Sequence, residues 1–208
     1  MVFATDRDLL AHDPEVFHRV VWAGQRLASG TATLSGTVVT FETVDVPLDV
    51  SGVGAGAVVL VGGTPYEVLD RTGATELSVS KLRGRVTDAP IPGGELSTAV
   101  PAQVATFAPQ TALVHAQLLR MLGIDSSSEG EVVDPASLAE VEALGTLHLV
   151  WSGASALSGP ESPAGKRAEW FRKRYAAARR EAVVPLDRDG DGEADATRRL
   201  NVLHVARF

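Results

Sequence analysis

The chain contains no cysteine, which excludes disulfide bonds, thiolate metal sites and a cysteine nucleophile. Aromatic residues make up only 5% of the 208 residues, which favours a core of Ala, Val and Leu over a large aromatic-lined pocket. No stretch reaches the ~18 uninterrupted apolar residues of a membrane span, and the N-terminus lacks the blocks of a secretory signal peptide. We therefore expect a soluble protein with no membrane partner, used inside a cell or built into an assembly.

Motifs of known enzyme classes are also missing. The sequence has no nucleophile elbow and no Walker A loop, and its five histidines are scattered. Gly52, Gly54 and Ala57 match the G-x-G-x-x-A pattern, but a strand-like run (AVVLVGG) follows where dinucleotide binding requires a helix. The sequence therefore predicts no catalytic residue and no organic cofactor.

The pattern of apolar residues changes twice along the chain. Helical periodicity is expected over residues 5–29, and short strands rich in β-branched residues over 31–106. Helices return at 109–122, after Asp134-Pro135, and after Ser162-Pro163, and a β-hairpin is expected at 183–207. This order predicts an α+β fold with a helical domain (1–30 and 107–208) of about four helices. A small antiparallel β-barrel of about five strands (31–106) is inserted into it.

Carboxylates are concentrated in DRDGDGEAD, residues 187–195. Asp187, Asp189, Asp191, Glu193 (through its backbone carbonyl) and Asp195 have the spacing of the first five ligand positions of a calcium loop, and Gly192 has that of its sharp turn. However, the position for the closing acid holds Arg198, and the preceding segment resembles a strand instead of a helix. Calcium is therefore a candidate ligand with a structural role, and the alternative is a turn built from Asp and Gly.

Positive charge is concentrated in residues 163–182, although the whole chain has a net charge of −7. This segment contains seven cationic side chains, among them Arg172 and Arg179, and only two acidic ones. The net charge argues against a globally basic nucleic-acid binder. The basic segment is either a solvated helix face or a surface for an acidic partner, which could be a protein or the DNA backbone.

The two ends of the chain resemble the head–tail connector (adaptor) proteins of long-tailed bacteriophages and prophages. The resemblance rests on TDRDLLAHDPEVF, TFAPQTALVHAQLLRMLGI, DPASLAEVEALGTLHLVWSGAS and the segment from SPAGKRAEWF to RRLNV. It covers roughly residues 1–30 and 107–208. The inserted β-domain departs from the smallest, all-helical members and resembles the SH3-like barrels of phage structural proteins.

The resemblance implies a mechanical role without catalysis. Such adaptors form a ring, generally a dodecamer, beneath the portal protein at the virion neck, and the ring is assembled in the host cytoplasm. The ring extends the channel through which double-stranded DNA passes without sequence recognition, and it supports a tail-side neck or stopper protein. By this resemblance the hairpin would contact the portal, and the basic helix would contact an acidic neighbour. The residues expected to bind these partners are Val184, Leu186, Arg198, Arg199, Leu200, Val202, Arg172 and Arg179.

A calcium-dependent adhesion or scaffolding module is the alternative function. It would use the carboxylates of residues 187–195, and it predicts secretion, for which the N-terminus shows no signal. A nucleic-acid-binding module based on the β-domain is less favoured, because that domain contains only a handful of cations.

Overall fold

The computed structural model describes residues 2–20, 25–124 and 131–200. The fold is α+β and divides into two compact units. The barrel unit is Thr5–Phe107, and the helical unit comprises the described parts of Met1–Ala4 and Ala108–Phe208. The division differs from the expected boundary at residue 30, because the N-terminal helices group with the barrel. Among the described residues, no helix combines the length and the hydrophobicity that crossing a bilayer requires.

The N-terminal helix is shorter than expected. Helix α1 (Asp6–His12) begins with a capping box, in which the Asp8 carboxylate accepts a hydrogen bond from the Thr5 amide at 2.8 Å. Helix α2 (Val16–Arg19) is a single turn. The prediction of helix up to residue 29 is wrong for its last part, because strand β1 begins at Arg26 and pairs with a strand seventy residues later. A periodicity within one segment cannot reveal such a distant partner.

Six antiparallel strands form a closed barrel in the order β1-β2-β5-β4-β3-β6. The strands are β1 (Arg26–Ser35), β2 (Val38–Val44), β3 (Val58–Val61), β4 (Thr64–Arg71), β5 (Glu76–Ser80) and β6 (Glu95–Ala105). The small antiparallel barrel is confirmed, with one strand more than expected. Strand β6 closes it by pairing with both β1 and β3, which leaves no open sheet edge.

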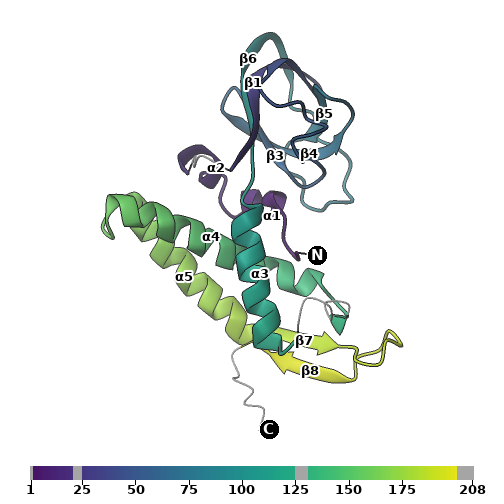
Figure 1. Ribbon diagram of the computed structural model, residues 1–208, viewed down its shortest axis with the longest axis vertical. Coiled ribbons are helices and arrows are strands. Elements are labelled where there is room, and N and C mark those ends of the chain that lie inside the picture. The colour runs from purple at the N-terminus through teal and green to yellow at the C-terminus, as the bar shows by residue number, and fades with distance from the viewer. Residues whose placement is uncertain (1, 21–24, 125–130, 201–208) are drawn as a thin grey trace. The chain divides into compact units, whose positions relative to one another are not determined.

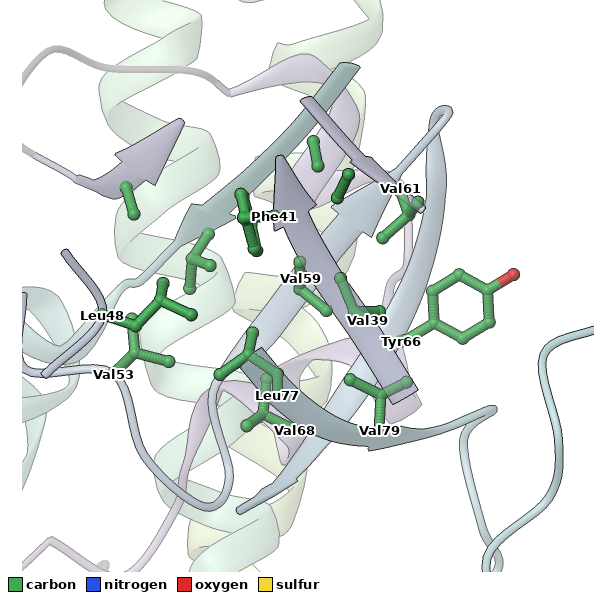
Figure 2. Packing of buried hydrophobic residues seen from close by; sticks show 14 of the residues in the cluster. Val39, Phe41, Leu48, Val53, Val59, Val61, Tyr66, Val68, Leu77 and Val79 are labelled. Carbon is green, nitrogen blue, oxygen red and sulfur yellow. The ribbon is translucent and has the colours of Figure 1, made fainter. Parts of the chain in front are cut away.

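The barrel core consists mostly of aliphatic side chains that alternate along the strands. Val39, Phe41, Val59 and Leu77 are almost fully buried and point into the barrel, as Figure 2 shows. Glycine is required at one strand crossing, because a Cβ at Gly30 would lie 1.8 Å from a carbonyl oxygen of β2. Gly30 thus permits the backbones of β1 and β2 to approach each other closely.

The described part of the helical unit contains three helices, so the expected bundle of about four helices is not confirmed. They are α3 (Ala108–Leu122), α4 (Ala136–Ser158) and α5 (Pro163–Glu181), and α4 and α5 lie side by side (Figure 1). Their ends follow sequence signals. Gly123 after α3 has a left-handed φ of 72°, and the Ser162 hydroxyl accepts a hydrogen bond from the Gly165 amide at the start of α5.

A β-hairpin follows α5, as the sequence predicts. Strand β7 (Val183–Leu186) pairs with β8 (Ala196–Arg199), and the acidic loop between them is at the tip (Figure 1). The hairpin is not isolated, because Val132 forms a β-bridge with Leu186, and the Asp187 amide donates to the carbonyl of Glu131 at 2.7 Å. The predicted continuation to residue 207, including Val202, lies outside the described residues.

Candidate functional site

Three carboxylates meet in the hairpin loop. One oxygen each of Asp187, Asp189 and Asp195 lie within 4.8 Å of one another, an arrangement that could hold a metal ion. Asp191 is outside this cluster of side-chain oxygens, as is the side chain of Glu193, for which the predicted ligand is the backbone carbonyl. The predicted ligands are therefore only partly brought together.

Backbone amides of this loop donate hydrogen bonds to its aspartate carboxylates. The two oxygens of Asp187 accept from the amides of Gly190 and Gly192, each at 2.7 Å, and Asp195 accepts from the Arg188 amide at 2.9 Å. The bond from Gly192 contributes most to lowering the pKa of Asp187 below its usual range. Since calcium takes six to eight oxygens, an ion here would need further ligands from water or from another segment. These hydrogen bonds agree with a turn built from Asp and Gly. The three clustered carboxylates supply only part of a calcium ligand set.

Helix α5 presents its cations on an exposed surface. The Arg172 guanidinium contacts the carboxylate of Glu169 through two hydrogen bonds, at 2.6 and 2.8 Å, and these lower the pKa of Glu169 to about 2. Both side chains are about half exposed, so solvent screens this pair and it contributes little to stability. Trp170 is 50% exposed, and the Arg174 guanidinium lies 4.7 Å from its ring centre. These exposed cations and this ring remain accessible to a partner.

A groove of about 540 Å³ on the surface of the helical unit is lined by residues of α3, α4 and α5. Its walls include the exposed side chains of Leu113 and Leu149 together with Arg172 and Arg179, and Gly145 lies at its floor. A Cβ at Gly145 would lie 2.7 Å from a methyl of α3 and 2.9 Å from the ring of α5. The absence of a side chain at this position therefore permits the close packing of the three helices.

Two hydrogen-bond donors in the groove have no acceptor among the described residues. They are the hydroxyl of Tyr175 and the Nε of Arg179, and both atoms are buried. The Arg179 guanidinium lies 5.2 Å from the centre of the Tyr175 ring, and burial raises the pKa of Tyr175 above its ordinary value. The sequence pattern does not reveal this role of Tyr175, because helical periodicity does not report whether a hydroxyl finds a partner.

His115 and His148 lie at helix–helix contacts. The Nδ1 of His115 is 2.7 Å from a carboxylate oxygen of Glu142, which joins α3 to α4. Glu142 is fully buried and also accepts from the Ala4 amide, so it holds the N-terminal segment of the same unit. His148 contacts the Ala168 carbonyl at 3.2 Å. Because His115 and Glu142 are buried and neither lines the groove, their arrangement is that of a structural pair.

The predicted partner-binding residues divide into two groups. Val184, Leu186 and Leu200 are buried within the helical unit, so the expectation that they offer an apolar surface to a partner is wrong for this conformation. Their aliphatic side chains pack inward because the hairpin lies against the rest of its unit. Arg199 is exposed and Arg198 is partly buried on β8.

The chain matches no protein-family model, no curated protein and no solved structure. The acidic loop, the cationic helix and the groove are therefore the features that bear on its function.

Proposed function

We propose that the protein is the structural head–tail adaptor of a tailed bacteriophage or prophage, without catalytic activity. The observation that carries this proposal is the separation of charge within the helical unit. Helix α5 has seven cations and two acids, whereas residues 187–195 have five acids and one cation. Surfaces of opposite charge on one unit favour head-to-tail contacts between copies, which generate a ring when the rotation closes.

In this role, copies of the chain form a dodecameric ring beneath the portal at the virion neck. The SH3-like barrel is an inserted module of each copy, and the tail-side neck or stopper protein binds the opposite end of the ring. The chain has a net charge of −7, which lets double-stranded DNA slide through the channel with little attraction to its wall.

The hairpin is the element that contacts the portal. Arg198 and Arg199 supply charge for this contact, and Val183 is its exposed aliphatic residue, at 48% exposure. The buried side chains of Val184 and Leu186 fix the hairpin to its own unit. Their role is therefore to hold the contact surface in place.

The test is the size of the full chain in solution, alone and with a portal ring from the same phage or prophage. We expect a complex in which several copies co-sediment with each portal ring, visible as an added layer by electron microscopy. The matched control is a chain with Arg198→Glu and Arg199→Glu, which should lose most of this binding while its circular dichroism is unchanged. If the wild-type chain does not bind the portal at micromolar concentration, the adaptor function is wrong.

Calcium binding by the acidic loop is the second candidate, because three carboxylates lie within ligand distance of one another. Such a site would clamp the hairpin tip in a scaffolding or adhesion module. Calorimetry of the full chain with CaCl₂ would show heat that disappears in the Asp187→Asn variant. No heat at millimolar calcium would contradict this candidate.

A further inference from the structure

The groove between α3, α4 and α5 contains donors that lack an acceptor. Tyr175 is only 7% exposed, and its hydroxyl lies beside the Arg179 side chain, yet neither the Tyr175 O–H nor the buried Nε of Arg179 has an acceptor within the described chain. A buried donor without an acceptor lowers stability by about 1–3 kcal/mol. One incoming oxygen ligand could satisfy both groups, since they belong to neighbouring side chains one helical turn apart.

The lining of the groove defines the chemistry of that ligand. Its charged or titratable side chains are Arg172, Arg179, His148 and Tyr175, and none of its lining residues is an acid. Hydrogen bonds from a guanidinium to an ionised oxygen are stronger than those between neutral groups. Leu113, 64% exposed, adds an apolar wall. The groove therefore favours a carboxylate on a compact segment that also covers aliphatic surface.

We propose that the groove binds the acidic loop, residues 187–195, of a second copy of this chain. The loop has a net charge of −4, from five acids and one arginine, and its exposed acids include Asp189, Asp191 and Glu193. Gly190 and Gly192 carry no side chains at the tip of the loop, and the groove has a volume of about 540 Å³. This contact rests on the proposed adaptor function and identifies the surfaces that join neighbouring copies.

The contact is formed between copies, because the loop and the groove are separate within one helical unit. The lining residues of the groove all belong to α3, α4 and α5, while the loop is at the tip of the β7–β8 hairpin (Figure 1). Two different patches then meet at each interface, which is the heterologous type that forms rings or filaments. Each copy provides one loop and one groove, so every contact repeats around the assembly.

The experiment is a charge-reversal cycle on the full chain, measured by sedimentation velocity at low salt over micromolar to millimolar concentrations. The groove variant carries Arg172→Glu and Arg179→Glu, and the loop variant carries Asp189→Arg and Asp191→Arg. We expect each variant to weaken self-association by about tenfold or more, as truncation of interfacial charge pairs does. We expect an equimolar mixture of the two variants to form heterodimers, because the reversed groove then meets the reversed loop.

Two single substitutions separate this contact from a general effect of charge or of misfolding. Tyr175→Phe removes the hydroxyl without changing charge, and we expect weaker self-association with a melting temperature equal to or above that of the wild type. Lys173→Glu changes the charge of the same helix at a side chain outside the groove lining, and we expect little effect. Equal association of wild type and Tyr175→Phe would overturn the proposal.

The remaining outcomes distinguish this contact from the adaptor function. A wild-type chain that stays monomeric at millimolar concentration, or variants that still assemble on the portal with wild-type stoichiometry, would refute the contact and leave the adaptor function intact. If the groove variant instead loses only binding to a double-stranded oligonucleotide, the groove binds phosphate and the proposal is wrong. Salt-sensitive self-association without portal binding would support the contact and contradict the adaptor function.

Discussion

Replacing Asp6 by Asn tests the energetics of the barrel unit most directly. The Asp6 carboxyl lies near the start of this unit and accepts a hydrogen bond from the amide of Phe107, its last residue, at 2.8 Å. The side chain is buried, and burial raises its pKa from 3.8 to about 6, against the opposing effect of hydrogen bonds from Thr106 and Phe107. The carboxyl thus joins the two points where the chain enters and leaves the unit, although burial makes its ionised form less favourable.

The size and sign of the effect follow from linkage. Because the folded unit binds this proton more tightly than the unfolded chain, the contribution is fully present below pH 3.8 and is lost as pH rises through about 6. The difference between the two pKa values corresponds to about 3 kcal/mol, of which about 2 kcal/mol falls between pH 4.5 and 7.5. In Asp6→Asn the amide oxygen still accepts from Phe107 and no charge is buried. The variant should therefore be more stable at pH 7.5, by up to about 3 kcal/mol.

Hydrogen exchange of β3 and β6 amides in the full chain measures this difference, since the exchange rates report the opening free energy of the barrel. The wild-type free energy should fall between pH 4.5 and 7.5 by about 2 kcal/mol more than that of Asp6→Asn. Asp49→Asn, which removes an exposed carboxylate of the same unit, is the control and should follow the wild type. Parallel profiles for wild type and Asp6→Asn would refute the reasoning.

Three further predictions concern packing and charge. Gly145→Ala should destabilise the helical unit by about 1–2 kcal/mol, because overpacking against the side chains of Val114 and Tyr175 outweighs the gain of about 1 kcal/mol in helix propensity. Urea unfolding followed by tryptophan fluorescence measures this loss of stability. A variant more stable than the wild type would contradict the close packing of the helices around Gly145. Glu67→Gln should lower the unfolding free energy of the barrel unit by about 3–5 kcal/mol. The Glu67 carboxylate is buried between Arg7 at 2.6 Å and Arg83 at 2.5 Å, so its loss leaves two poorly compensated cations. Hydrogen exchange of β4 amides tests this prediction, and a loss below 1 kcal/mol would argue against it. Ser162→Ala should cost about 1 kcal/mol through loss of the α5 cap, visible as a lower melting temperature, whereas Ser162→Asp should retain most of the stability.

Local signals in the sequence account for the helical unit well. Ser162 before α5, Gly123 after α3 and the apolar stripes between them fix where helices begin and end, because caps and periodicity act within a few residues. The hairpin was predictable for the same reason, since its turn contains Gly190 and Gly192 with φ of 79° and 90°. The separation of cations in α5 from acids in the loop is also a property of the sequence alone.

The tertiary structure decided the features that depend on distant partners. The extent of strand β6 is one such feature, because Pro101 and several polar residues interrupt its apolar pattern and it pairs with both β1 and β3. The burial of Val184 and Leu186 inside their own unit likewise depends on residues 131–133 lying alongside. In the same way, the pairing of the Tyr175 hydroxyl and Arg179 as buried donors follows from the packing of three helices, because whether a polar atom is satisfied depends on every segment that surrounds it.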